Sequence, residues 1–192
     1  MRKQIIILVI LCLIYEYLIT LNNQKHSLKV YYNEIPVYSE NNNASVLRRN
    51  LNTWFDRLVI DKGGIDGIEE GAYITSNGAL IGIITEVSSS TSVVRLITDS
   101  ENKLSVKILD KEIYGLIDDY KNDYLIMTGV KNDKVSIGDK VVTTGIGYIY
   151  PDNIYIGEVA KVVKNDFDST LEVLIKTPID FNNIYYVLVV NR

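Results

Sequence analysis

Short β-type runs fill the chain from residue 57 onward, and they constrain its fold more than any other feature. Each run is rich in Val, Ile, Leu or Tyr and is bounded by Gly, Asp or Asn, as expected of strands joined by tight turns. No segment after residue 60 keeps a 3.6-residue apolar period long enough for a major helix. About eleven strands at this spacing predict an all-β sandwich or β-barrels. The predicted strands are 57–60, 72–75, 80–87, 93–98, 104–109, 113–117, 124–128, 140–143, 154–163, 171–176 and 185–190.

Two glycine-framed segments repeat one pattern. Glycine pairs with equal spacing enclose two strands that each end in threonine, and these pairs are Gly71 with Gly78 and Gly138 with Gly145. A second strand with an internal glycine follows each pair, at 80–87 and 155–162. The turn glycine supplies a positive φ, and the internal glycine allows a strand to coil sharply. The repeat predicts two related barrel units; a chance likeness between glycine-bounded hairpins is the alternative.

The N-terminal segment 5–21 is apolar enough to enter a bilayer. As a helix it would span roughly 25 Å, against about 30 Å of hydrocarbon. Glu16 would cost roughly 3 kcal/mol at mid-bilayer, but each Ile, Leu or Val returns roughly 0.3 to 0.6 kcal/mol, so that insertion is favoured. We therefore predict a transmembrane helix anchored by Ile5, Ile10, Ile14 and Leu21.

A cleaved signal peptide is the alternative for this segment. Such a peptide should end at small residues, and the first alanine of the chain is Ala44. Arg2 and Lys3 precede the segment, which favours a cytoplasmic N-terminus. The predicted order is a cytoplasmic N-terminus at 1–4, a transmembrane helix at 5–21, a polar linker at 22–45 and an extracytoplasmic β domain at 46–192.

The chemistry that an enzyme would need is missing from the β domain. His26 is the only histidine and lies in the linker, and Cys12, the only cysteine, lies in the predicted anchor. No histidine is therefore available in the β domain to activate a serine, and the sequence predicts no catalytic, cofactor or metal site. The net charge of -4 also argues against nucleic acid as a partner.

Three polar motifs in the β domain are predicted to be turns rather than sites. The acidic pairs Glu69-Glu70 and Asp118-Asp119 lie beside expected turns, where carboxylates are solvated. The segment 61–64, with the sequence DKGG, lacks the spacing of a phosphate loop and opens no expected helix.

A long motif opens the β domain. Residues 52–71 read NTWFDRLVIDKGGIDGIEEG, which includes Trp54 and Phe55 and the predicted turn glycines Gly63, Gly67 and Gly71. Further matching segments follow in order at 78–82, 86–87, 96–99, 137–145, 150–151, 156–159 and 180–181. These motifs and their spacing resemble the MreC family, the rod shape-determining proteins of bacteria, over nearly all of residues 46–190.

The resemblance implies an ectodomain of two small six-stranded β-barrels, one of them similar to the barrels of trypsin-like proteases but without their catalytic residues. It further implies a non-enzymatic membrane-anchored scaffold for cell shape and cell-wall elongation. The implied partners are MreB-, MreD- and RodZ-like proteins and peptidoglycan synthases of the RodA/PBP2 type. The polar linker stands where the family usually has a long coiled coil and is expected to hold a short one or none, and self-association through the barrels stays open. Residues 100–135 match the family only in strand periodicity.

Trp54 and Phe55 are the first candidates for a functional surface. Large aromatic side chains fill barrel ends as readily as they form interfaces, so that both roles remain open. Two other classes of function compete with the scaffold: a membrane-tethered enzyme, and a membrane-tethered glycan- or ligand-binding ectodomain. The fourteen tyrosines keep the glycan-binding alternative open, since exposed aromatics gathered in one groove would favour it.

Overall fold

A computed structural model describes residues 42–49, 52, 54–131, 134–147, 149–164 and 170–191. The predicted anchor with Ile5, Ile10, Ile14 and Leu21, and the predicted linker up to residue 41, lie outside these residues. Where the structure describes the chain, it holds no helix of the length and hydropathy required to cross a bilayer.

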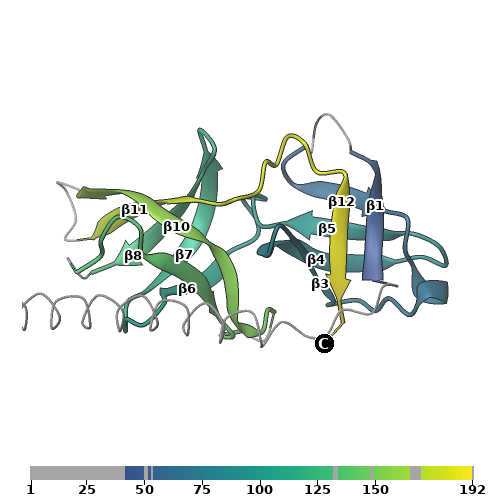
Figure 1. Ribbon diagram of the computed structural model, residues 1–192, viewed down its shortest axis with the longest axis horizontal. Coiled ribbons are helices and arrows are strands. Elements are labelled where there is room, and N and C mark those ends of the chain that lie inside the picture. Colours follow the sequence, from purple (N-terminus) through teal and green to yellow (C-terminus); the bar gives the residue numbers. More distant parts are fainter. Residues whose placement is uncertain are drawn as a thin grey trace, which may run out of the picture. The chain divides into compact units, whose positions relative to one another are not determined.

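The described residues form twelve strands and one 3-10 turn, arranged as two closed antiparallel barrels of six strands each (Figure 1). In the first barrel the ring order is β1-β12-β3-β4-β5-β2. Its strands are β1 (Asn43–Arg48), β2 (Arg57–Ile60), β3 (Tyr73–Ser76), β4 (Ala79–Val87), β5 (Ser92–Leu96) and β12 (Tyr186–Val190). In the second barrel the ring order is β10-β11-β8-β7-β6-β9. Its strands are β6 (Leu104–Ile108), β7 (Tyr114–Lys121), β8 (Tyr124–Val130), β9 (Lys140–Thr144), β10 (Asp152–Lys164) and β11 (Leu171–Lys176). The predicted fold class is confirmed.

Strand β1 is the one strand that the sequence did not predict. It begins at Asn43, within the stretch interpreted as a linker, and pairs with both β2 and β12. Asn43 and Ser45 are residue types that favour turns and Ala44 is a type depleted in strands, so Val46 and Leu47 leave only a short apolar run as a β signal. The pairing is instead fixed by tertiary contacts, among them the bond from the Ser45 amide to the Asp61 carboxylate at 2.6 Å.

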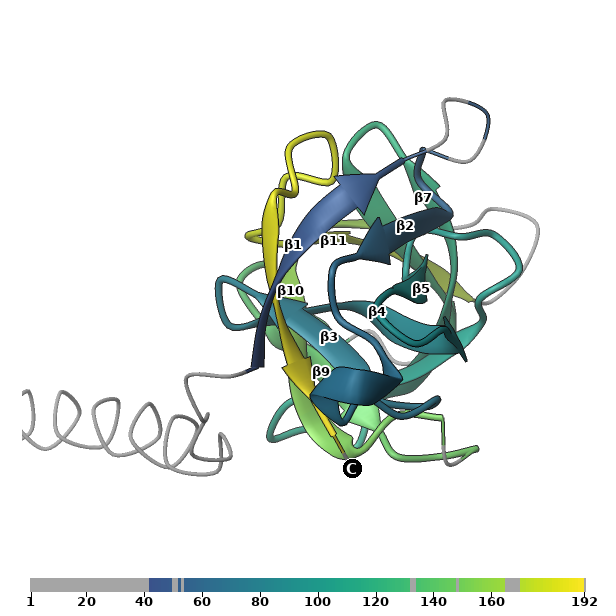
Figure 2. The same ribbon diagram turned by 90° about the vertical axis from the view of Figure 1, so that its right-hand side faces the viewer.

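The two barrels share one ring order but exchange their last strands. Read from β3, the first ring is β3-β4-β5-β2-β1-β12, and read from β9, the second is β9-β10-β11-β8-β7-β6. Strands β1 to β5 thus correspond to β7 to β11, and β12 corresponds to β6. Yet β6 follows β5 along the chain, and β12 follows β11. Each barrel is therefore closed by a strand from the other half of the sequence, as the yellow β12 beside the blue β1 shows (Figures 1 and 2).

Backbone hydrogen bonds confirm the repeat that the glycine spacing predicted. In the first barrel the Gly71 amide donates to the Ile84 carbonyl at 2.9 Å, and the Ile84 amide donates to the Ala72 carbonyl at 2.8 Å. In the second barrel the Gly138 amide donates to the Val159 carbonyl at 2.8 Å, and the Val159 amide donates to the Asp139 carbonyl at 2.8 Å. The same pair of backbone hydrogen bonds thus joins the residues before β3 to β4 in the first barrel and the residues before β9 to β10 in the second.

Strand β4 is buried on both of its faces. Leu80, Ile81, Ile83 and Ile84 are all nearly inaccessible to solvent, although neighbours along a strand point to opposite faces. One face lines the barrel interior, so the other must be covered from outside, and β10 of the second barrel is in contact with β4. The two contacting strands occupy equivalent positions in their rings. This explains why β4 reads as a continuous apolar run.

The predicted turn glycines differ in the reason why glycine is needed at each position. Five of them have positive φ values of 67° to 87°, and these are Gly67, Gly71, Gly78, Gly138 and Gly145. Gly63 instead has an extended backbone with φ of -146°. It precedes the 3-10 turn η3 (Gly64–Asp66), and a Cβ there would lie 2.4 Å from the Ser88 carbonyl oxygen. Gly63 is thus required by close packing rather than by its φ.

Candidate functional site

Three aromatic rings meet where the loop between β1 and β2 contacts the second barrel. Phe55 comes from that loop, Tyr120 from β7, and Phe181 from the segment that returns from β11 to β12. The ring centroids of Phe55 and Tyr120 are 5.5 Å apart, as are those of Tyr120 and Phe181. We call these three residues the aromatic seam. Tyr120 lies between the other two rings, and Phe181, which is 1% exposed, is the most buried of the three.

The hydroxyl of Tyr120 remains at the edge of the aromatic seam. It donates a hydrogen bond to the Asp123 carboxylate at 3.1 Å. Burial, together with this hydrogen bond and the nearby charges of Asp123 and Asp180, raises the pKa of Tyr120 to about 12. The hydroxyl is therefore neutral at physiological pH, and its role here is to donate rather than to act as a base.

Arg49 connects the loop that carries Trp54 to the segment between β11 and β12. Its guanidinium lies 4.5 Å from the centre of the Trp54 ring, an arrangement that favours cation–π attraction. The Nη1 group donates to the Phe181 carbonyl at 2.6 Å, and the Nη2 group donates to the Trp54 carbonyl. Trp54 and Arg49 are both half-buried. The stacked pair thus lies next to the aromatic seam and is partly open to solvent.

A polar contact also links the two halves. The Asn102 side-chain amide, in the segment between β5 and β6, donates to the Tyr150 hydroxyl at 3.1 Å and to the Leu96 carbonyl at 3.0 Å. Asn102 and Tyr150 are both buried. Burial raises the pKa of Tyr150 to about 12. In the same segment the Thr98 hydroxyl donates to the Phe55 carbonyl, which connects this polar contact to the aromatic seam.

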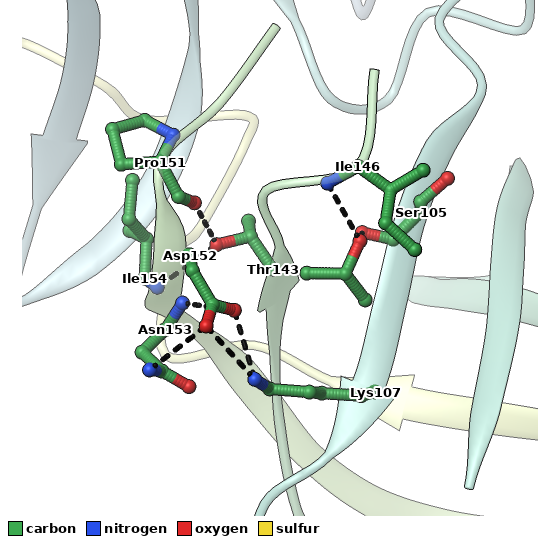
Figure 3. Close-up of polar contacts among 9 residues, drawn as sticks. Ser105, Lys107, Thr143, Ile146, Pro151, Asp152, Asn153 and Ile154 are labelled. Carbon is green, nitrogen blue, oxygen red and sulfur yellow. Dashed lines mark hydrogen bonds and ion pairs between the residues drawn. The ribbon is translucent and has the colours of Figure 1, made fainter. Parts of the chain in front are cut away.

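The densest polar cluster holds the exchanged strand β6 in the second barrel (Figure 3). Asp152 begins β10, and Lys107 of β6 contacts both of its carboxylate oxygens, at 2.8 and 3.1 Å. The Thr143 hydroxyl donates to the Pro151 carbonyl and accepts from the Ile154 amide at 2.9 Å. These bonds fix the hairpin between β9 and β10 against β6. The polar groups of this cluster form hydrogen bonds and an ion pair with one another, so we assign the cluster a structural role.

The polar motifs of the sequence occupy structural positions. Glu69-Glu70 lie in the connection between η3 and β3, as predicted. Asp118-Asp119 do not lie in a turn, because β7 continues to Lys121 through a register irregularity after Ile117. The Asp118 carboxylate accepts a hydrogen bond from the Thr128 hydroxyl at 2.9 Å on the neighbouring strand, which holds it in the sheet.

The described residues contain no cluster of three or more His, Cys, Asp or Glu side chains suited to a metal ion. His26 and Cys12 lie outside the described residues. The segment 61–64 leads into the single turn η3, which docks on the tip of the hairpin between β4 and β5 through bonds from Gly64 and Ile65 to the Ser88 and Ser89 carbonyls. It forms a packed turn rather than a phosphate loop.

Among the residues that the structure describes, the exposed tyrosines are divided between the barrels. Tyr114 begins β7 of the second barrel, whereas Tyr185 directly precedes β12 of the first barrel and Tyr186 begins it. A glycan-binding groove would require such side chains to gather on one surface. The placement of these described tyrosines does not favour the glycan-binding alternative.

Of the two aromatic residues that the sequence singled out, Phe55 enters the aromatic seam and Trp54 stacks against Arg49. Their structural partners, Tyr120 and Phe181, were missed. Residues 180–181 belong to a motif of the family that the sequence resembles, but no local signal connects them with residue 55. The association depends on the exchange of strands between the barrels.

These features define a double β-barrel protein whose two halves are joined by aromatic and polar contacts. A sequence model of the family described as "Rod shape-determining protein MreC, barrel core" matches residues 46–191, and the chain belongs to this family.

Individual relatives support the assignment of the chain to this family. The cell shape-determining protein MreC of Listeria monocytogenes is 35% identical over 156 residues, which cover 78% of this chain and 53% of that protein. The chain therefore spans about half the length of this curated relative. A solved MreC structure from Listeria monocytogenes has 30% sequence identity and a TM-score of 0.72, with 92% of this chain and 91% of that chain covered.

A further structure is a complex between a penicillin-binding protein (PBP2) and MreC from Helicobacter pylori. It has 18% identity and a TM-score of 0.58, and it covers 78% of this chain and 96% of that chain. At this identity the likeness shows the fold alone.

Proposed function

We propose that this chain is a non-enzymatic scaffold for cell shape and cell-wall elongation, and that its double barrel docks partner proteins. The observation that carries the proposal is the family match across residues 46–191, which includes nearly all of both barrels. The relatives are named as cell shape-determining proteins rather than as enzymes. The complex of Helicobacter pylori MreC with a penicillin-binding protein supports a peptidoglycan synthase as one partner.

The proposal includes a membrane anchor at residues 5–21 with a cytoplasmic N-terminus, so that the barrels lie outside the cytoplasm. The support is the apolar run after Arg2 and Lys3. MreD-, MreB- and RodZ-like proteins and RodA-like synthases are the further proposed partners. The anchor is tested by Ile10→Asp combined with Ile14→Asp, which should release the chain from membranes into the soluble fraction. Retention of this variant after alkaline washing would contradict the anchor.

The scaffold is tested by depletion of the protein and microscopy of the cells. Loss of the protein should produce rounded or swollen cells, because elongation would lose its organiser. Affinity purification of the tagged full chain from solubilised membranes should recover a penicillin-binding protein of the elongation machinery. Normal shape and growth after depletion, with no elongation protein recovered, would overturn the proposed function.

A further inference from the structure

Arg49 carries a positive charge that the described part of the chain does not neutralise. An arginine side chain has five N–H donors. Two of them are used on the Phe181 and Trp54 carbonyls, and the Nε group is buried without a hydrogen-bond partner. Ion pairs among the described residues involve other side chains, so no carboxylate of these residues pairs with Arg49.

The surroundings make this an unfavourable place for a lone cation. Burial lowers the pKa of the Arg49 guanidinium, and no carboxylate of the described residues acts to raise it. A half-buried charge is ordinarily paired, because neutral carbonyls only partly replace the water that it loses. The guanidinium also cannot swing freely into solvent, since its two carbonyl bonds and the Trp54 ring hold it in place. The guanidinium is thus held in place with one N–H of Nη1 and one N–H of Nη2 left to receive an anion, whereas the Nε group is buried.

The chemistry of the pair indicates what kind of anion fits. Arginine forks match carboxylates in two-point hydrogen bonds, and their strength grows when water is partly excluded. Trp54 adds a large apolar face beside the charge, and Trp together with Arg is the combination most enriched where protein interfaces gain their affinity. Arg48, which is exposed at the end of β1, adds a second positive charge next to the site.

We propose that Arg49 and Trp54 form the docking point for an acidic segment of a partner protein, whose carboxylate pairs with the Arg49 guanidinium while its apolar stem contacts Trp54. The inference rests on the proposed function, in which the double barrel docks proteins, and it names the chemistry of that partner. The aromatic seam behind the pair fixes the carbonyl of Phe181 and so sets the position of the fork.

Trp54 is the only tryptophan of the chain, so its fluorescence reports on this site without a label. The full chain in detergent is titrated with an acetylated hexaglutamate peptide, and a hexaglutamine peptide of equal length serves as the neutral control. We expect a saturable change in emission with hexaglutamate alone, weakened by high salt. No change with hexaglutamate up to its solubility limit, or an equal change with hexaglutamine, would overturn the proposal.

Two variants separate the site from general charge attraction. Arg49→Gln should weaken hexaglutamate binding by about tenfold or more, because a charge-assisted bond in a partly buried site is lost. Arg48→Gln removes the same charge from the adjacent exposed position and should weaken binding by about threefold or less. Equal effects of the two substitutions would show a diffuse basic surface and overturn the proposal.

Because Arg49 also holds the loop of Trp54, Arg49→Gln can affect folding, which circular dichroism and thermal unfolding will reveal. Arg49→Lys keeps the charge but loses the planar fork, so it should fold and still bind hexaglutamate several-fold more weakly than the native chain. Undiminished affinity in Arg49→Lys would overturn the role of the fork.

Co-purification with the penicillin-binding protein distinguishes a failure of the docking point from a failure of the proposed function. If the native chain recovers this partner and Arg49→Gln recovers it equally well, the proposed function stands and the docking point is wrong. If the native chain recovers no partner, the proposed function fails, while the fluorescence titration still decides whether the site binds carboxylates.

Discussion

The backbone of Gly82 on β4 approaches that of Arg95 on β5 so closely that a Cβ at Gly82 would lie 2.1 Å from the Arg95 carbonyl oxygen. Gly157 on β10 has the same relationship with Lys176 on β11, where the corresponding distance is 2.4 Å. Strands β4 and β5 correspond to β10 and β11 in the shared ring order. The internal glycines of the sequence repeat are therefore required for the same reason in both barrels.

Gly82→Ala and Gly157→Ala should each lower the free energy of unfolding by about 3 kcal/mol, because the added methyl group meets backbone atoms that cannot turn away. Urea unfolding followed by circular dichroism measures the loss. Gly64→Ala is the matched control, since its Cβ would meet the Ser88 carbonyl oxygen at an ordinary 3.7 Å. The control should change stability by less than about 1 kcal/mol. A Gly82 variant as stable as the control would contradict the close approach.

Removal of the most buried ring of the aromatic seam should be costly. Phe181→Ala is expected to lower the free energy of unfolding by about 3 to 5 kcal/mol, because Phe181 is 1% exposed and leaves a cavity between the two halves. Tyr186→Ala, at a position that is 74% exposed, should cost about 1 kcal/mol or less. Similar losses for the two variants in urea unfolding would show that the seam adds nothing beyond ordinary strand contacts.

The buried hydroxyl of Tyr150 should make stability depend on alkaline pH. Burial raises its pKa from the ordinary 10.0 to about 12, so the folded state holds this proton more tightly than the unfolded state. That contribution is complete below pH 10.0 and is lost as the pH rises toward about 12. Tyr150→Phe should cost about 1 to 2 kcal/mol near neutral pH through loss of the bond from Asn102.

The difference in stability between the native chain and Tyr150→Phe should therefore shrink between about pH 8 and about pH 11. Urea unfolding at both values measures it, with Tyr186→Phe as the exposed control. A difference that stays constant over this range would contradict the raised pKa.

The cluster that holds the exchanged strand β6 offers a comparison between a buried hydroxyl and an ion pair. Thr143 is fully buried and its hydroxyl joins the Pro151 carbonyl to the Ile154 amide, so Thr143→Val should cost about 1 to 3 kcal/mol. Asp152→Asn breaks a partly exposed ion pair with Lys107 and should cost about 1 kcal/mol or less. Thermal unfolding of both variants tests the order. A larger loss for Asp152→Asn would show that the ion pair dominates the cluster.

Local sequence predicted most of the strands because their alternation and bounding turn residues are local properties. The strand 57–60 and the strand 171–176 were predicted with the same bounds that the structure shows. Strand β1 was not predicted because Asn43, Ala44 and Ser45 have little β preference, and its pairing depends on β2 and β12. Asp118-Asp119 were placed in a turn because the predicted strand ended at residue 117, yet β7 continues to Lys121 and the bond from Thr128 holds Asp118 in the sheet.

The residues of the candidate site likewise fall into those that the sequence predicted and those that only the structure revealed. The sequence singled out Trp54 and Phe55 from their motif, but Arg49, Tyr120 and Phe181 became part of the site only through contacts between distant segments. Nothing in the neighbourhood of Arg49 in the sequence shows that its charge would stack on Trp54 and lack a carboxylate.

The sequence by itself determined the all-β class, most of the strands and the two-fold repeat of glycine-framed hairpins, because each depends on residues close together along the chain. Only the tertiary structure decided which strand closes which barrel. The exchange of β6 and β12 places residue 120 beside residues 55 and 181, and backbone pairing of this kind is set by the closure of both rings at once. No local pattern encodes such closure, since it depends on contacts across the whole domain.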